Sequence, residues 1–422
     1  MTRLTPPASG RPTSSPSADG TLGLVLTRRS LACAGLAGVL AAGCGWNELP
    51  ATPSEAPLTA APGASASTAT SISTARAFTL VATGDVLLHE PLWEQARQDA
   101  EVSGQESLDF APQLAAIRPL VEAADIAVCH LETPLAAVDG PYEGYPTFSG
   151  PPQILPALAA TGYDACTTAS NHTFDQGAAG VDRTLDALDA AGLEHTGSAR
   201  TAEEAARTAI LDVVTATGSV RLGLLSYTFG FNGIPYPSGE TWRGNLIDEQ
   251  RILADSQLAR QHGAEVVVVA LHWGTEFDQH PNDEQLALGP SLLASPDIDL
   301  VLGHHAHVVQ PVEQVDGEWV VYGLGNLVAA HATPGEPLRE GLLVRFGFTE
   351  QPDGSFRATA AGYAPLLVTD PYPARVLDVA NALRTADSTA PMERLQEAWD
   401  RTTAVVASRG ATDAGLVPLS TP

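Results

Sequence analysis

Five short apolar segments of this chain are each followed by side chains of the kinds that bind metal ions, and this pattern constrains the fold most. The segments read as β-strands, and they end in Thr83-Gly84-Asp85, Cys129-His130-Leu131-Glu132, Ala169-Ser170-Asn171-His172, Ala270-Leu271-His272-Trp273-Gly274 and Leu302-Gly303-His304-His305-Ala306-His307. In an open, largely parallel sheet, ligands bind beyond the carboxyl ends of the strands. We therefore expect the five motifs to converge on one rim.

The remaining hydropathy pattern indicates an α/β fold. Apolar β-type runs at about 78–83, 125–129, 164–168, 220–226, 265–271 and 298–302 alternate with helical patterns at about 112–124, 153–161, 177–191, 247–262 and 283–294, which is typical of βαβ units. Paired β runs follow at 308–315, 318–322, 342–348 and 356–365, with hairpin-turn signals at Asp316-Gly317 and Asp353-Gly354. Helical stretches at 374–385 and 391–401 close a domain that we expect over 77–405, and a loose tail follows at 406–422.

The first 76 residues carry export signals. Thr27-Arg28-Arg29-Ser30-Leu31 is a twin-arginine pair before an apolar run that ends at Gly43, too short for a membrane span of about 20 residues. We interpret 1–43 as a twin-arginine signal peptide with a lipobox and Cys44 as the lipidated residue. The Ala-, Ser-, Thr- and Pro-rich stretch 44–76 should be a disordered tether. The prediction is a lipid-anchored protein on the outer face of the cell membrane.

Two further cysteines, Cys129 and Cys166, lie at the ends of predicted buried strands. Export would permit a disulfide between them. Small buried thiols are the reading that we favour from the sequence.

The formal net charge is −27, and all basic residues are arginine. Such a chain disfavours nucleic acid as a partner, because that binding needs many cationic contacts to phosphate. It also repels anionic polymers unless a divalent cation or a local arginine cluster intervenes.

The residues at the strand ends make a mixed oxygen and nitrogen set of two carboxylates, one asparagine and several histidines. This set suits a pair of first-row divalent ions such as Mn, Fe or Zn better than Ca or Mg. Each motif alone has an ordinary structural explanation: Asp85 as a turn cap, Glu132 as an arginine partner, His272 as a packed core imidazole. Their recurrence at five strand ends favours a shared site. His89 is a further candidate ligand, with a surface role as its alternative, and His331 is expected to be incidental.

As a set, these motifs resemble the CapA/PgsA family of poly-γ-glutamate capsule synthesis proteins. The resemblance rests on Gly84-Asp85-Val86, Leu131-Glu132, Ser170-Asn171-His172, Phe174-Asp175-Gln176-Gly177, His272-Trp273-Gly274, Gly303-His304-His305-Ala306-His307 and Tyr322-Gly323-Leu324-Gly325-Asn326. It covers about residues 78–365.

The resemblance implies a metallophosphoesterase-like sandwich of two mixed β-sheets flanked by helices. It implies a set of metal ligands, namely Asp85, Glu132, Asn171, His272, His305 and His307. It makes His172 the catalytic acid, with Asp175 grouped beside it as catalytic, and His304 competes with His305 for one ligand role. His130 is a further candidate ligand, but we expect it, like His331, to support the ligands from behind or to be incidental. On the substrate side we place Trp273, Asn232 and Asn326.

The chain also departs from the superfamily pattern. Leu87 stands where a metallophosphoesterase usually has histidine, Glu132 replaces the usual bridging aspartate, and a third histidine is inserted in the last motif. In the CapA family asparagine is common at the position of His130. One of the two metal sites is therefore expected to be reshaped or lost.

Three functions follow from the resemblance. The first is a surface lipoprotein of poly-γ-glutamate synthesis or export, partnered by the synthase and export components, that hydrolyses or transfers the anionic polymer with metal-activated water. The second is an extracellular metallophosphoesterase, which arginines near the metals would favour, with Arg243, Arg118 and Arg183 as candidates. The third is a non-catalytic, metal-dependent binder of an anionic polymer.

Overall fold

The computed structural model describes residues 75–105, 107–237, 239–332, 335–369, 373–386 and 388–422. The predicted signal peptide, Cys44 and all of the predicted tether but its last two residues lie outside this part of the chain. Within the described part, no helix has the length and apolar character needed to cross a bilayer.

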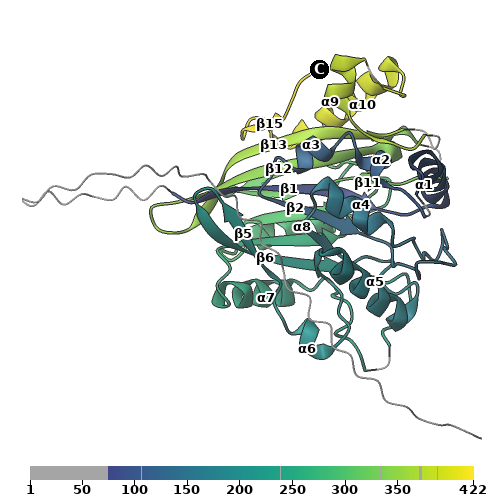
Figure 1. The fold of residues 1–422 in the computed structure, drawn as a ribbon. Helices are drawn as coiled ribbons and strands as arrows, with labels where there is room; N and C mark the ends of the chain where they lie inside the picture. The colour runs from purple at the N-terminus through teal and green to yellow at the C-terminus, as the bar shows by residue number, and fades with distance from the viewer. Residues whose placement is uncertain (1–74, 106, 238, 333–334, 370–372, 387) are drawn as a thin grey trace, which may run out of the picture. The chain divides into compact units, whose positions relative to one another are not determined.

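Among the described residues, nine strands form one mixed sheet. Its central path runs in the order β14-β13-β12-β1-β2-β3-β4, while β11 pairs with β1 and β15 with β13. Figure 1 shows the middle of this path, with β13, β12, β1 and β2 side by side. The strands are β1 (Ala77–Val86), β2 (Ile126–Leu131), β3 (Ala165–Thr167), β4 (Glu194–Thr196), β11 (Asn326–Val328), β12 (Glu340–Glu350), β13 (Phe356–Val368), β14 (Val376–Asp378) and β15 (Leu416–Pro418). Strands β1 to β4 are parallel, whereas β12, β13 and β14 pair antiparallel.

The second sheet has six strands among the described residues, in the order β5-β6-β7-β8-β10-β9. They are β5 (Ile210–Thr215), β6 (Gly218–Thr228), β7 (Val266–His272), β8 (Leu300–His304), β9 (Val312–Val315) and β10 (Glu318–Val321). Strands β6, β7, β8 and β10 are parallel, and the two edge strands are antiparallel. Every residue of β7 is buried, as expected for a parallel strand covered on both faces.

Helices cover the outer faces of the two sheets (Figure 1). The bounds are α1 (Glu90–Ser103), α2 (Ala111–Leu114), α3 (Arg118–Val121), α4 (Ile154–Thr161), α5 (Gly177–Ala191), α6 (Ala202–Ala205), α7 (Glu249–Gln261), α8 (Asp283–Leu293), η1 (Glu336–Arg339), α9 (Val379–Thr385) and α10 (Met392–Ala407). One core cluster joins the first sheet to α1, α4 and α5, another joins the second sheet to α7 and α8, and a third lies between the two sheets. The predicted sandwich of two mixed sheets flanked by helices is confirmed.

Two expectations about elements are wrong, and one helix is not among the predicted elements. The helix expected at 112–124 is two short helices, α2 and α3, because Pro119 lacks the N–H that would continue the first one. Helix α1 is not predicted by the hydropathy pattern, because charged residues dilute its buried Leu92 and Trp93. The tail after 405 is ordered: β15 pairs with β13, and Leu416 is buried in the core between the sheets.

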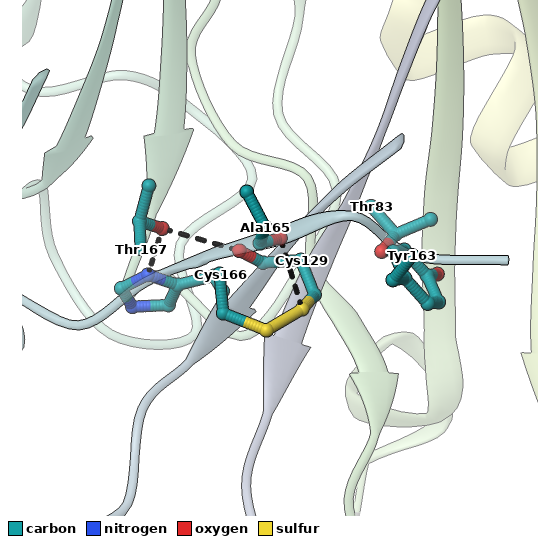
Figure 2. Close-up of a disulfide and its surroundings, with 7 residues drawn as sticks. Thr83, Cys129, Tyr163, Ala165, Cys166 and Thr167 are labelled. Atoms are coloured by element: carbon teal, nitrogen blue, oxygen red, sulfur yellow. Dashed lines mark hydrogen bonds between the residues drawn. A yellow bond between two sulfur atoms is a disulfide. The ribbon is translucent and has the colours of Figure 1, made fainter. Parts of the chain in front are cut away.

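Cys129 and Cys166 form a disulfide, which corrects the expectation of two separate thiols (Figure 2). The two residues are register partners on the parallel strands β2 and β3, with Cα atoms 4.5 Å apart. That spacing lies within the range that a disulfide spans. The cross-link ties together the strands that precede Glu132 and Asn171.

Candidate metal centre

The carboxyl ends of β1, β2, β7 and β8 bring the predicted ligands to one buried cluster. Asp85 is fully buried at the end of β1 and receives hydrogen bonds from His304 Nδ1 at 2.9 Å and the His305 backbone N–H at 3.2 Å. His307 Nδ1 lies 3.3 Å from Oδ2 of Asp85, the oxygen that also accepts from the His305 N–H. Burial alone would raise the pKa of Asp85, but the hydrogen bonds from His304 and His307 hold it well below its usual range.

The close approach of two chain segments sets the position of Asp85. The Asp85 N–H donates to Gly325 O at 2.9 Å. A side chain at Gly84 would place its Cβ 2.0 Å from that same oxygen, so only glycine permits this contact. The Gly-Asp pair of the first motif is therefore required by the packing of β1 against the segment that leads into β11.

Glu132 is the clearest sign that the cluster is built for a cation. Both of its carboxylate oxygens are buried, and neither has a hydrogen-bond partner among the described residues. The nearest cationic candidates are His307 Nε2 at 3.7 Å and His272 Nε2 at 3.8 Å from Oε1. Burial raises the pKa of Glu132 well above its usual range. An unpaired buried carboxylate costs several kcal/mol, and a bound divalent ion would remove that cost.

Single ligand atoms from Asp85, Glu132 and His307 lie within 4.8 Å of one another. A carboxylate–carboxylate–imidazole group of this size suits a first-row divalent ion. His305 adds a buried Nδ1 atom that has no hydrogen-bond partner among the described residues. The donors present therefore fit the metal that the sequence predicts.

His272 of the fourth motif and Asn171 of the third motif meet next to Glu132. His272 Nε2 lies 2.8 Å from Asn171 Oδ1, and His272 Nδ1 lies 3.0 Å from His130 Nε2. Burial, followed by the repulsion of His305 and His130, holds the pKa of His272 well below its usual range, which keeps this imidazole neutral. All six predicted ligands thus lie in one cluster, while their binding of an ion stays a prediction.

The loop after β8 is strained where it carries two of these histidines. His305 and His307 have φ angles of 86° and 56°, in the left-handed region that costs a non-glycine residue about 1–2 kcal/mol. Such strain gathers at functional sites, where the surroundings hold it. This one short segment brings the rings of His304 and His307 and the backbone N–H of His305 to Asp85.

His172 and Asp175 form a pair at the edge of the cluster. His172 Nδ1 donates to Asp175 Oδ2 at 2.7 Å, and the Phe148 N–H donates to the same oxygen at 2.7 Å. The Phe148 ring packs edge-on against the His172 ring at 4.8 Å. These contacts fix the His172 ring and leave its Nε2 atom outside the pair.

A second layer of rings surrounds His307. His331 lies 4.8 Å from both His307 and His89 between ring centroids, and its Nε2 is buried with no hydrogen-bond partner among the described residues. His89 instead accepts from Ala330 N or donates to Leu87 O through Nδ1. Burial, followed by the repulsion of His307, lowers the pKa of His89 to about 4 and that of His331 to about 2.

Glu276 is a candidate ligand that the sequence analysis missed. One ligand atom each from Glu276, His305 and His307 lie within 4.8 Å of one another, and Glu276 is exposed. Its signal in the sequence is its position, since it follows the His272-Trp273-Gly274 motif after a single residue. An acidic side chain there reaches the rim from the end of β7.

Two substrate-side predictions are wrong. Trp273 is 1% exposed and donates from Nε1 to Tyr322 O at 3.0 Å. Asn326 is fully buried, and its Oδ1 accepts from His307 Nδ1 at 3.1 Å. Both point inward because of the pleat and the packing of their segments, which the sequence does not reveal. Asn232 is exposed, and its Oδ1 accepts from Asn171 Nδ2 at 3.2 Å, while its role toward a substrate stays a prediction.

The three candidate phosphate-binding arginines are engaged elsewhere. Arg243 pairs with Asp182 at 2.5 Å, Arg118 with Glu122 at 2.7 Å, and Arg183 donates to Leu135 O at 2.8 Å. A cavity of about 600 Å³ lined by residues of β4, β6, α6 and α7 also lies apart from the candidate ligands.

Comparison with known proteins identifies relatives of this chain. The family model described as bacterial capsule synthesis protein PGA_cap matches residues 79–331. The PGA biosynthesis protein CapA of Bacillus subtilis is 26% identical over 207 residues, 49% of this chain and 53% of that protein. A protein of Mycobacterium tuberculosis named "probable polyglutamine synthesis accessory protein" is 29% identical over 221 residues, 49% of this chain and 56% of its own length. The chain thus spans about half the length of these curated relatives.

Similar solved structures include a calcineurin-like phosphoesterase from Bacillus subtilis, 15% identical with a TM-score of 0.43, covering 78% of this chain and 97% of the other. A 5′-nucleotidase precursor from Thermus thermophilus is 15% identical with a TM-score of 0.41, covering 78% of this chain and 58% of the other. At these sequence identities and TM-scores, the similarity gives no information about the site. The matched family span contains every strand-end motif, and the predicted resemblance is confirmed.

Proposed function

This chain belongs to the family of bacterial capsule synthesis proteins PGA_cap, and on that premise we propose that it is a cell-surface accessory protein of poly-γ-glutamate synthesis or export. Its partners in this role are the polymer and the synthase or export components at the membrane. The observation that carries a chemical role is the buried, unpartnered carboxylate of Glu132 beside Asp85 and His307. That arrangement favours metal-dependent action on the polymer over a purely structural part.

The proposed cofactors are two divalent ions of the Mn, Fe or Zn class. Asp85, Glu132 and His307 would hold one ion, and Glu132 would share the second with Asn171, His272 and His305. Such ions, when bound, polarise a carbonyl group and activate water for attack. The chain's own contribution is to hold these donors in place and to keep the imidazole of His272 neutral.

His172 is the proposed general acid. Because its Nδ1–H donates to Asp175, its Nε2 atom can hold the proton that the leaving nitrogen or oxygen receives. Asp175 in turn is fixed by the backbone N–H of Phe148. A positioned general acid typically accelerates a reaction about 10²–10⁴-fold. We assign a contribution of this size to the His172–Asp175 pair.

Surface chemistry favours a polymer over a phosphoester. The three arginines that would favour phosphate are bound elsewhere in the fold. Exposed aromatic rings instead lie beside the histidines, with Phe229 at 4.5 Å from His305 and Phe277 at 6.1 Å from His307 between ring centroids. Such rings offer apolar contact to the methylene groups of a γ-linked glutamate chain.

Placement outside the cytoplasm has two supports. The twin-arginine and lipobox pattern before Cys44 favours export and lipid anchoring. The Cys129–Cys166 disulfide favours an oxidising compartment.

The test is an assay of the purified protein on poly-γ-glutamate and on phosphoesters, with added Mn or Zn. We expect chain shortening or transfer of the polymer that needs the metal, falls about 10²–10⁴-fold in His172→Asn, and disappears together with the bound metal in Glu132→Gln. Hydrolysis of phosphoesters alone by the metal-loaded protein would overturn the polymer role and favour a phosphoesterase.

A further inference from the structure

His130 occupies an unusual position, because both of its ring nitrogens are already hydrogen-bonded. Nδ1 lies 2.8 Å from Thr167 Oγ1, and Nε2 lies 3.0 Å from His272 Nδ1. The ring is fully buried and stacks on His304 at 4.1 Å between centroids. Although His130 lies within ligand distance of Asp85 and His304, binding an ion would break one of these hydrogen bonds.

We propose that His130 is a positioning residue, which holds His272 with its Nε2 atom turned into the candidate metal centre, and that Thr167 in turn holds His130. This inference rests on the metal centre proposed above. His272 Nε2 faces Asn171 Oδ1 at 2.8 Å and Glu132 Oε1 at 3.8 Å. The opposite nitrogen of the same ring is the one that His130 contacts.

Thr167, His130 and His272 have two hydrogen-bonded arrangements with the same number of protons, and the second of them gives up the hydrogen bond between His272 Nε2 and Asn171 Oδ1. In the first, Thr167 donates to His130 Nδ1, His130 Nε2–H donates to His272 Nδ1, and His272 Nε2–H donates to Asn171 Oδ1. In the second, His272 Nδ1–H donates to His130 Nε2, and His130 Nδ1–H donates to Thr167, whose hydroxyl turns to Cys129 O at 3.4 Å. Between the two arrangements, each neutral imidazole carries its single N–H proton on a different ring nitrogen.

Only the second arrangement leaves a lone pair on His272 Nε2 for a cation. It is also the arrangement that a cation strengthens, because an imidazole bound through one nitrogen is a stronger hydrogen-bond donor at the other. His130 therefore favours ligation by His272 without binding the ion itself. The hydroxyl of Thr167 serves both arrangements, because it can act as donor or acceptor.

The surrounding backbone supports this chain of contacts. His130 on β2 is the register partner of Thr167 on β3, and the preceding pair is Cys129 and Cys166. Successive residues of a strand point to opposite faces, so the disulfide cross-links the two strands directly behind the His130–Thr167 hydrogen bond. The covalent bond fixes the register on which that hydrogen bond depends.

The experiment measures Mn and Zn affinity of the full chain by calorimetry for wild type and variants. We expect His130→Phe to weaken binding about 10–100-fold. His130→Gln, whose amide oxygen can accept the hydrogen bond from His272, should recover most of the loss. Thr167→Val should weaken binding less than His130→Phe does, and Thr167→Ser should retain it. Thr161→Val is the matched control, because it removes another buried hydroxyl, which donates to Ala157 O at 2.7 Å within α4.

Nitrogen NMR of the cadmium-loaded protein supplies a readout that a merely structural role would not change. We expect metal coupling on His272 Nε2, a proton on His272 Nδ1, and no metal coupling on His130. Metal coupling on His130, or wild-type affinity in both His130→Phe and Thr167→Val, would overturn this inference while leaving the metal centre intact. Absence of binding by the wild type would overturn the metal centre, and this inference with it.

Discussion

The two ring nitrogens of His307 have different surroundings, which decides what this residue can bind. Nδ1 faces Asn326 Oδ1 at 3.1 Å, and Nε2 faces Glu132 Oε1 at 3.7 Å. Asn326 cannot easily turn, because its Nδ2 donates to His307 O at 3.1 Å and Leu338 O at 2.9 Å. Its oxygen, together with Asp85 Oδ2 at 3.3 Å, therefore keeps the proton on Nδ1 and leaves Nε2 for an ion.

Asn326→Leu should weaken metal affinity about 10–100-fold. It also leaves two buried carbonyls without a donor, which should lower the free energy of unfolding by about 1–3 kcal/mol. Calorimetric titration with Zn measures the first effect and urea denaturation the second. Leu416→Ala is the control, because it destabilises the core away from the site by about 2–5 kcal/mol and should bind Zn normally. Equal Zn affinity in Asn326→Leu and wild type would contradict this role.

Asp299 makes stability depend on pH. It is buried beside Arg260 and accepts from Val267 N at 2.6 Å, and burial, partly offset by Arg260, raises its pKa to about 6. A raised pKa stabilises the fold fully below the unfolded value of 3.8, and this contribution is lost as pH rises through about 6. Relative to Asp299→Asn, the wild-type free energy of unfolding should fall by about 2 kcal/mol between pH 4 and 7. If urea denaturation shows that the free energy of unfolding depends on pH in the same way in wild type and Asp299→Asn, this prediction is contradicted.

At the scale of elements, the sequence predicts the strand ends well because a polar residue after an apolar run is a local signal. Asp85, Glu132 and His272 follow this rule and meet at the rim. What a local signal cannot give is the direction of a side chain or a pairing over long distance. Trp273 and Asn326 therefore turn inward against expectation, and β15 pairs with β13 although its segment reads as a tail.

The disulfide is the clearest case of a long-range feature. Whether Cys129 and Cys166 meet depends on the register of β2 and β3, which no short window of sequence specifies. Their separation of 37 residues predicts a contribution of about 4 kcal/mol to the free energy of unfolding. Urea denaturation should show this loss in a Cys129→Ala, Cys166→Ala double variant, and wild type with reductant should match the variant. A double variant as stable as the oxidised wild type would contradict this.

At the scale of the whole molecule, the net charge of −27 opposes an anionic polymer. Binding of poly-γ-glutamate should therefore require divalent ions at the candidate centre, and a chelator should abolish it. Co-sedimentation of protein with polymer measures this, with Glu132→Gln as the metal-deficient control and an uncharged, esterified polymer as the ligand control. Equal binding in chelator and in Mn would show that the polymer is recognised elsewhere.

The most direct test of the metal centre is anomalous X-ray diffraction from crystals grown with Mn or Zn. We predict a strong anomalous peak bounded by Asp85, Glu132 and His307, which is lost in a Glu132→Gln crystal grown in the same way. Saturating metal with no peak at that position, or a peak only beside Glu276 at the rim, would contradict it.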